Sequence, residues 1–583
     1  MLRPPDFFLM TLPIRSNATR LAWMVASSAL LVVNASAQSP SYRLTKAVDT
    51  QTQVPGADPG VSFADFDSDG PKLQGRSLCW ESAFVDPGTG ATQGVFTLSP
   101  CGTIAPIVFD SDIAPDGLSF GALRDPNISG DRAFWRTFSP DGLYLKSADG
   151  SGPVSTIADT STLIPNTSVP FADISDFGVS GDLVHFTGDD GSSFQDSSFV
   201  KDLSTNTLSV FAERGEPSPF AGPPATIDRV FGPMVRDGRL CVVAEDTDRT
   251  VGLLADFGRG RVSLVDTNDP APGGLGNFRF FRDPSIAETK VAFIGLTGSA
   301  GGSGSVYLYD HADGSIVAIA DETVARPTGG FFGGGASRPS LTVVNGTTIV
   351  IFTDFAQDPG ATEAIWAWID GTFVRVVGVG DIIDGGIVTG WNMDEAGYAA
   401  DGVDFAVRLQ FADGGDALYY AELQPENISV YCRADQGDCS CANENPLGGC
   451  ANSTGCGARL LPLGTTSVTV DDLQLLATDL PPNTSALFVI STSQNRASFN
   501  DGVLCVGSPP LGFFRVPPIF NTGPTGDISL GPGLVALSSS PQFPLPGGIQ
   551  AGQTWFVQLL YRDAGSCGAG ANGSDAIAVT FTP

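Results

Sequence analysis

Between residues 63 and 405 the chain repeats one pattern of apolar and polar positions seven times. Each copy has a turn, a short apolar run that ends in a bulky residue, and a hairpin in which apolar and polar residues alternate. The copies lie 50 to 59 residues apart. Such a period, built from strands and from turns rich in Gly, Asp and Pro, is typical of a β-propeller. The sequence therefore predicts seven blades, marked by Trp80, Trp135, Phe186, Val243, Phe293, Phe352 and Phe405.

The seventh copy is incomplete, and its missing strand is found near the start of the chain. The copy runs through 417–423 and then leaves for the next segment without a returning strand. Residues 44–55 match 155–165, which end the second copy. Because a closed ring removes exposed sheet edges, we expect the residues around Leu44 to Val48 to form the last strand of the seventh blade.

A second β-domain is predicted after a linker at 424–429. Its apolar residues alternate with polar ones in runs separated by turn clusters, as in a β-sandwich. The runs are 467–470, 473–477, 486–490, 555–561 and 576–581. The predicted fold class is therefore all-β, with a seven-bladed propeller at 38–425 and a disulfide-containing sandwich at 426–583.

The first 37 residues have the features of a secretory signal peptide. Arg15 and Arg20 precede the apolar stretch 21–33, and the small residues at 35–37 form a cleavage site before Gln38. That stretch is too short for an ordinary membrane span, and no later segment is long and apolar enough for one. We expect an exported chain without a transmembrane segment, in the extracellular medium, at the cell surface or in the periplasm.

The charge of the chain argues against nucleic-acid partners. The formal net charge is −32 at pH 7, while only 16% of the residues are charged and 42% are hydrophobic. The composition is that of a globular protein. An acidic surface repels the phosphates of nucleic acids and of anionic lipids, so we expect neither as a ligand.

Seven of the ten cysteines lie beyond residue 430, as expected for disulfides in an exported domain. The sequence does not fix their pairing, and a zinc cluster around Cys439 and Cys441 is the alternative interpretation. Cys79 and Cys241 occupy equivalent positions beside the bulky residue of their repeats and are predicted to be buried free thiols. The disulfide candidates are Cys432, Cys439, Cys441, Cys450, Cys505 and Cys567.

The cysteine-rich segment also carries short motifs over nearly its whole length. They are Cys439-Ser440-Cys441 with Asn443, 449–455, 471–473, 501–505, 551–554, Tyr561-Arg562-Asp563, Cys567-Gly568 and 576–583. With these motifs the segment resembles a Cys-rich β-domain found at the ends of many exported proteins of environmental bacteria. It departs from that pattern at Leu560, where Trp is usual, at Ala442, where Gly is usual, and at Cys456, which is additional.

The repeats likewise resemble exported bacterial propellers of unknown function. Together the two resemblances imply a β fold and export, and they bring no established activity to the chain.

One acidic motif is a candidate metal site. Asp65, Asp67 and Asp69 alternate around a turn opened by Gly70, an arrangement that suits the oxygen ligands of calcium. The motif resembles the calcium loops of integrin-type propellers, although its twelfth position is Arg76 and not Glu. The alternative is an acidic turn at the start of a blade. Calcium is the single candidate cofactor.

No motif indicates catalysis, and we name no catalytic residue. His185 and His311 are predicted to be a buried strand residue and a solvated turn residue, and no Gly-x-Ser-x-Gly elbow is present. With 63 acidic residues, a carboxylate pair for glycoside hydrolysis is always available and indicates nothing.

We therefore predict a non-enzymatic binding or cell-surface protein whose ligand is a carbohydrate or a protein. The alternatives are a polysaccharide-active hydrolase or lyase with its site in the propeller channel, and a structural protein of the cell envelope.

Overall fold

The described part of the chain is built almost entirely of strands and turns. The computed structural model describes residues 40–66, 70–138, 141–191, 197–220, 224–297, 304–332, 336–344, 346–355, 363–393, 400–401, 404–434, 437–508, 512–541, 548–564, 568 and 570–583. Within these ranges the helical elements are η1 (Pro272–Gly274) and α1 (Leu534–Ser538). The predicted signal peptide lies outside the described residues. Where the structure is described, it contains no helix with the length and apolar character needed to pass through a membrane.

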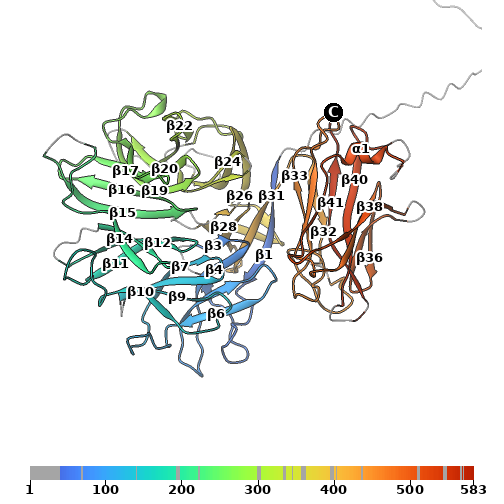
Figure 1. Ribbon diagram of the computed structural model, residues 1–583, viewed down its shortest axis with the longest axis horizontal. Helices are drawn as coiled ribbons and strands as arrows, with labels where there is room; N and C mark the ends of the chain where they lie inside the picture. Colours follow the sequence, from blue (N-terminus) through green and yellow to red (C-terminus); the bar gives the residue numbers. More distant parts are fainter. Residues whose placement is uncertain are drawn as a thin grey trace, which may run out of the picture. The chain divides into compact units, whose positions relative to one another are not determined.

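The described residues of 41–424 form seven antiparallel sheets that follow one another along the chain, as in a β-propeller (Figure 1). The first sheet contains β2 (Asp65–Phe66), β3 (Lys72–Gln74), β4 (Ser77–Ala83), β5 (Gln93–Leu98) and β6 (Ile104–Phe109). The second contains β7 (Leu123–Ser129), β8 (Arg132–Phe138), β9 (Asp141–Ser147) and β10 (Ser155–Asp159). The third contains β11 (Asp173–Ser180), β12 (Leu183–Asp189), β13 (Ser197–Asp202) and β14 (Thr207–Ala212).

The remaining four sheets continue the same order along the chain. The fourth contains β15 (Ile227–Arg236), β16 (Arg239–Asp246), β17 (Val251–Asp256) and β18 (Arg261–Asp266), and the fifth β19 (Phe278–Ala287), β20 (Lys290–Thr297), β21 (Ser305–Asp310) and β22 (Ser315–Ala320). The sixth contains β23 (Ala336–Val344), β24 (Thr347–Asp354), β25 (Ala364–Ile369) and β26 (Thr372–Gly378). The seventh contains β27 (Ile382–Ile383), β28 (Gly386–Asn392), β29 (Ala400–Asp401), β30 (Asp404–Phe411), β31 (Asp416–Gln424) and β1 (Ser41–Asp49). First strands of successive sheets, such as β11, β15 and β19, contact one another.

The two ends of the propeller segment meet in the seventh sheet. Strand β1 pairs antiparallel with β31, from Ser41 opposite Gln424 to Asp49 opposite Ala417, and the register shifts between Lys46 and Val48. Residues 44–48 therefore lie beside the seventh repeat, as the incomplete last copy predicts. The pairing covers the edge of β31 with backbone hydrogen bonds, which is how a ring of sheets avoids an exposed edge.

Aromatic trios fill the space within five of the sheets. Each trio joins a residue ahead of or at the start of the first strand, the bulky residue of the second strand and an aromatic residue of the third strand. In the fifth sheet these are Phe278, Phe293 and Tyr307, all buried. Such ring pairs add about 0.5–1.5 kcal/mol each to the effect of burial. The other trios are Phe63, Trp80 and Phe96; Phe120, Trp135 and Tyr144; Phe171, Phe186 and Phe199; and Phe332, Phe352 and Trp366.

The register corrects one predicted marker. In the first sheet Trp80 lies opposite Phe96. In the seventh sheet the aromatic residue of the third strand is Tyr419, and it lies opposite Val407. The equivalent position is thus Val407, two residues after Phe405. Both side chains are buried on the same face of β30, because strand side chains alternate with a period of two.

The C-terminal segment has two larger sheets around one hydrophobic core. Side chains of both, including Leu475, Phe488 and Ile577, belong to the same buried cluster. The five-stranded sheet is β32 (Ile428–Cys432), β41 (Ala571–Thr580), β40 (Thr554–Arg562), β35 (Ser485–Ser491) and β38 (Phe514–Asn521). The three-stranded sheet is β33 (Arg459–Leu463), β34 (Gln474–Thr478) and β39 (Ile528–Leu530), and a separate hairpin joins β36 (Gln494–Phe499) to β37 (Gly502–Val506).

Disulfides occur in both parts of the chain. Cys432 pairs with Cys505, Cys439 pairs with Cys450, and Cys441 is also disulfide-bonded. Cys567 lies outside the described residues. A further disulfide joins Cys101, between β5 and β6 of the first sheet, to Cys456 of the C-terminal segment. The predicted buried free thiols are confirmed, since Cys79 and Cys241 are free and fully buried.

A buried ion-pair cluster also links the seventh sheet to the C-terminal segment. Glu422 of β31 lies 2.6 Å from a guanidinium nitrogen of Arg433 and 2.7 Å from one of Arg459. All three side chains are at least nine-tenths buried. Burial alone would raise the pKa of Glu422, but the charges of Arg433 and Arg459 outweigh it and lower the pKa to about 2. Glu422 is therefore ionised, and both arginines depend on it for compensation.

Candidate functional site

The loops of the propeller that connect neighbouring sheets lie at one edge. Antiparallel strands alternate in direction, so the connections between second and third strands share an edge with those that lead from one sheet to the next. We name this edge the loop face. It comprises the described residues of 50–64, 84–92, 110–122, 160–172, 190–191, 213–226, 247–250, 267–277, 321–332, 379–385 and 412–415.

Six of the connections between sheets contain the same small bridged hairpin. Each closes by an isolated antiparallel bridge, so each tip is held at a fixed base. The loop face is therefore a repeated, ordered surface that presents short tips. The bridges are Gln53 to Ser62, Ile113 to Ser119, Leu163 to Pro170, Pro217 to Thr226, Pro270 to Asn277 and Ala325 to Phe331.

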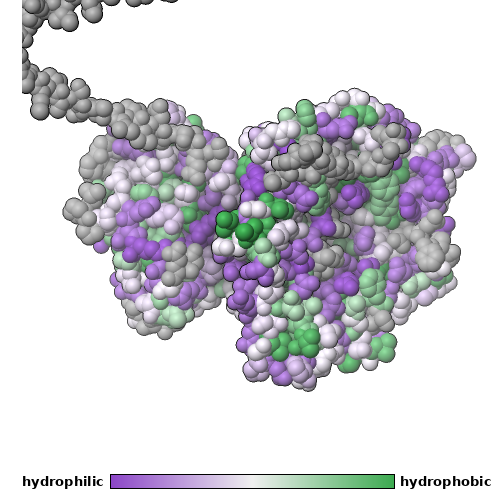
Figure 2. Space-filling view, turned by 180° about the vertical axis from the view of Figure 1, so that it is seen from behind, coloured by the Kyte–Doolittle hydropathy of each residue, from purple (hydrophilic) through white to green (hydrophobic). Residues whose placement is uncertain are grey.

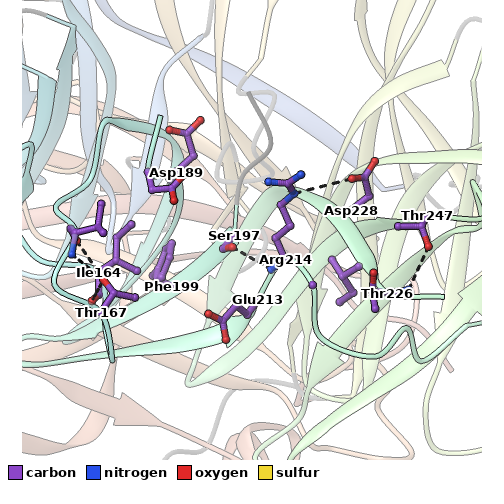
Figure 3. Close-up of a pocket in the computed structure, with 15 residues that line it drawn as sticks. Ile164, Thr167, Asp189, Ser197, Phe199, Glu213, Arg214, Thr226, Asp228 and Thr247 are labelled. Carbon is purple, nitrogen blue, oxygen red and sulfur yellow. Dashed lines mark hydrogen bonds and ion pairs between the residues drawn. The ribbon is translucent and has the colours of Figure 1, made fainter. Parts of the chain in front are cut away.

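A pocket of about 380 Å³ opens on the loop face between the third and fourth sheets (Figure 3). Residues of both sheets and of the connection 160–172 line it. The apolar lining residues are Ile164, Val169, Phe199 and Ile227, and the charged ones are Asp189, Asp190, Glu213, Arg214 and Asp228. Hydroxyl groups come from Thr167, Ser197, Thr226 and Thr247.

Two contacts fix the position of Arg214 in this pocket. Its backbone N–H donates to Ser197 Oγ at 3.0 Å, and its Nε lies 4.0 Å from a carboxylate oxygen of Asp228 (Figure 3). The carboxylates of Asp189 and Glu213 also line the pocket and are drawn in Figure 3. With four carboxylates and one guanidinium, the pocket has an acidic lining.

Burial raises the pKa of Asp189, and the nearby carboxylates of Asp173 and Asp190 add to this shift. A hydrogen bond from the Gly191 N–H, at 2.8 Å, opposes it. The carboxylates crowd together, so a ligand that donates hydrogen bonds or carries positive charge is favoured here.

Three sheets carry a long polar side chain at the same position of the second strand. Arg136 of the second sheet, Glu81 of the first and Arg408 of the seventh each directly follow the residue that lies opposite the third-strand aromatic. Each of these side chains bonds to a residue of a neighbouring sheet, so each marks a boundary between two sheets. In the third sheet the position is Thr187, which is buried and hydrogen-bonded to Ser175 of the same sheet.

The predicted calcium residue Asp65 belongs to one of these boundaries. Its carboxylate pairs with Arg408, which also binds Asp416 at 2.6 Å. Asp67 and Asp69 lie outside the described residues. Within the described ranges, no cluster of His, Cys, Asp and Glu could hold a metal ion. The calcium site stays a prediction, and the one described carboxylate of the motif is engaged by an arginine.

A second boundary holds a similar carboxyl pair, Asp141 and Asp173, near Arg136, whose own ion pair is with Asp125 at 3.1 Å. Burial raises the pKa of Asp141 to about 7, and a hydrogen bond with the Asp173 carboxyl group adds to the shift, while Arg136 opposes it. Asp141 and Asp416 both begin the third strand of their sheet, and Asp173 and Asp65 both begin the first strand of the next sheet. A carboxyl pair and an arginine thus join the sheets at two places.

Asp141 gives the stability of the protein a defined pH dependence. A carboxyl group whose pKa is raised on folding stabilises the folded state fully below its unfolded pKa, and this contribution is lost as the pH rises through about 7. Asp141→Asn should remove this loss. Because Asp141 is partly exposed to solvent, which screens the effect, we expect the wild type to lose about 1 kcal/mol more than the variant between about pH 5 and pH 8 in urea unfolding.

The matched control is Asp149→Asn in the same sheet. Hydrogen bonds from Ser151 and Ser147 lower the pKa of Asp149 to about 2, so this substitution should leave the slope between these pH values unchanged. Equal slopes for the wild type and Asp141→Asn would contradict the assignment.

The predicted burial of His185 is confirmed. The side chain is fully buried in the third sheet, where Nδ1 lies 3.1 Å from the Met234 carbonyl oxygen and Nε2 lies 2.5 Å from Ser198 Oγ. Burial lowers the pKa of His185 to about 4. The neutral ring therefore joins two strands of the core, and this Ser–His pair is closed to substrate.

The sequence did not indicate the pocket residues. Asp189 ends β12, Glu213 directly follows β14 and Asp228 is the second residue of β15, and no motif in the sequence connects them.

No protein-family model matches the chain, and no curated protein matches it. Among solved structures, it is similar to the β-propeller domain of the Trilobed protease from Pyrococcus furiosus, with 10% identity over 62% of this chain and 95% of that one, at a TM-score of 0.37. It is also similar to TolB from Acinetobacter baumannii, with 13% identity over 58% and 63% of the two chains and a TM-score of 0.28.

A third similar structure is a puromycin-hydrolyzing peptidase from Mycobacterium tuberculosis, with 12% identity over 75% of this chain and 63% of that one, at a TM-score of 0.38. These scores are too low for any activity of the three proteins to be transferred to this chain.

Proposed function

We propose that the chain is an exported binding protein that takes its ligand on the loop face, at the acidic pocket between the third and fourth sheets. In this proposal the seven sheets of 38–425 are the blades of a propeller closed by the N-terminal strand. Residues 426–583 form a disulfide-stapled β-sandwich, and residues 1–37 are a signal peptide. The pocket is the observation that carries the proposal, because it combines carboxylates, hydroxyl groups and apolar side chains in one concave site.

The chemistry of the lining favours binding over catalysis. The described lining residues include carboxylates and hydroxyl groups but no histidine, cysteine, lysine or tyrosine. The Ser–His pair of the third sheet is enclosed in the core. Export is supported by the disulfides, which persist in oxidising compartments.

The test is a binding screen of the secreted protein against immobilised oligosaccharides and peptides. Glu213→Gln removes one pocket charge while keeping the shape of the side chain. The matched control is Glu322→Gln, an exposed glutamate in the connection between the fifth and sixth sheets. We expect a bound probe to lose about tenfold in affinity with Glu213→Gln and to be unaffected by Glu322→Gln.

The rival functions give different outcomes in the same screen. Turnover of an oligosaccharide would favour the polysaccharide-active enzyme. If no probe binds, or if binding is insensitive to Glu213→Gln, the proposed site is wrong and the structural role in the cell envelope is favoured.

A further inference from the structure

The acidic pocket has apolar side chains next to negatively charged ones. Ile164 and Val169 of the connection 160–172 supply an apolar wall, and Asp189 and Glu213 supply negative charge. Lysine and arginine side chains combine an apolar stem with a cationic head, and they bury the stem along apolar surface. The pocket therefore matches both parts of a basic side chain, whereas a neutral sugar would use only the hydrogen-bond acceptors.

The size of the pocket also favours a single side chain. Its volume of about 380 Å³ is near the lower end of the roughly 300–1,000 Å³ typical of ligand pockets. Arg214 already occupies one side and is held by Ser197 and Asp228. The remaining space suits one side chain of a larger ligand better than an oligosaccharide.

Exposed apolar side chains occur on the loop face, both in the connection that forms the pocket wall and in the preceding part of the chain. Leu163 and Val169, in the connection that forms the pocket wall, are 55% and 42% exposed. Ile113 and Leu118 of the preceding connection, and Phe138 at the end of β8, are also exposed. Figure 2 shows the molecule from behind, and on that side hydrophobic patches are separated by hydrophilic surface. Grouped exposed apolar residues with a polar surround are a mark of protein-binding surfaces.

The negative charge of the chain and of the pocket favours a partner with a basic surface. The chain has a formal net charge of −32, and the pocket holds four carboxylates against one guanidinium. A basic protein surface would be attracted at long range, and a buried charge contact would then fix its orientation.

Resting on the proposed function, we infer that the ligand is a protein. Its lysine or arginine side chain enters the acidic pocket, and its neighbouring apolar residues pack on Leu163, Val169 and the flanking tips of the loop face. The inference names the partner class of the same site, which the proposed function leaves as carbohydrate or protein.

The experiment uses the full secreted chain and two short peptides. One has a central lysine flanked by leucines, and the other is identical except that the lysine is Nε-acetylated, which removes its charge. Titration calorimetry measures both affinities. We expect acetylation to weaken binding about tenfold or more, Glu213→Gln to weaken the lysine peptide by a similar factor, and Glu322→Gln to have no effect. Affinity for the lysine peptide should also fall with added salt.

Leu163→Ser provides a second, independent variant. Its exposed side chain makes the variant compatible with folding, and it should weaken both peptides, because it removes apolar contact and no charge.

Equal affinities for the two peptides, or no measurable binding of either, would overturn the inference. Binding of a neutral oligosaccharide that is sensitive to Glu213→Gln would overturn it while leaving the pocket as the binding site. Insensitivity of every probe to Glu213→Gln would remove the proposed site itself.

Discussion

Removal of residues 38–49 is expected to abolish cooperative folding of the propeller. These residues include β1, which pairs with β31 from Ser41 to Asp49 and buries Val48 in the cluster between the seventh and first sheets. Without β1, the edge of β31 is open and part of that core is exposed. The decrease in the free energy of unfolding should approach the whole stability of a typical domain, about 5–15 kcal/mol. Calorimetry of the truncated chain should show no sharp transition for the propeller.

A synthetic peptide of residues 38–50 provides the control. Added to the truncated chain, it should restore the transition with a midpoint that rises with peptide concentration, since anything that binds only the folded state stabilises it. A truncated chain that melts like the full protein would show that the ring does not depend on β1.

The second large effect is expected from Glu422→Gln. The substitution leaves the buried guanidinium groups of Arg433 and Arg459 without their shared carboxylate. Breaking a buried ion pair by removing one partner costs about 3–5 kcal/mol. Unfolding in guanidinium chloride should show that Glu422→Gln lowers the free energy of unfolding by about this amount.

The stability of the protein at acidic pH provides a second measurement of the role of Glu422. The pKa of Glu422 is lowered on folding to about 2, so its contribution is present above the unfolded value and is lost as the pH falls towards 2. The wild type should therefore lose stability in this acidic range more steeply than Glu422→Gln. Parallel curves for the two proteins would mean that the cluster is not ionised as described.

Much of the fold could be predicted because its units repeat. A side chain such as Trp80 or Phe293 is fixed by the same physical need in five of the seven copies, the filling of the space between strands by an aromatic trio. The seventh copy shows the limit of this reasoning. Its second strand presents buried residues at both Phe405 and Val407, and only the partner strand decides which one is equivalent to Trp80.

Contacts between distant segments that leave no repeat or motif in the sequence could not be predicted. Cys101 and Cys456 are 355 residues apart and pair because the first sheet and the C-terminal segment place them together. The acidic pocket likewise draws Asp189, Glu213 and Asp228 from separate strand ends. Each of these carboxylates looks like an ordinary turn residue in the sequence, and only their convergence makes a site.

The position of β1 determines when, during synthesis of the chain, the seventh sheet can be completed. Thr45 and Glu422, which share a hydrogen bond, are 377 residues apart, so nearly the whole propeller has to be synthesised before its first strand finds a neighbour. The entropic cost of closing so long a loop grows only slowly with its length, but the open edge persists until β31 emerges. A nascent or interrupted chain therefore leaves the backbone groups of β1 without their partner strand until β31 has been made.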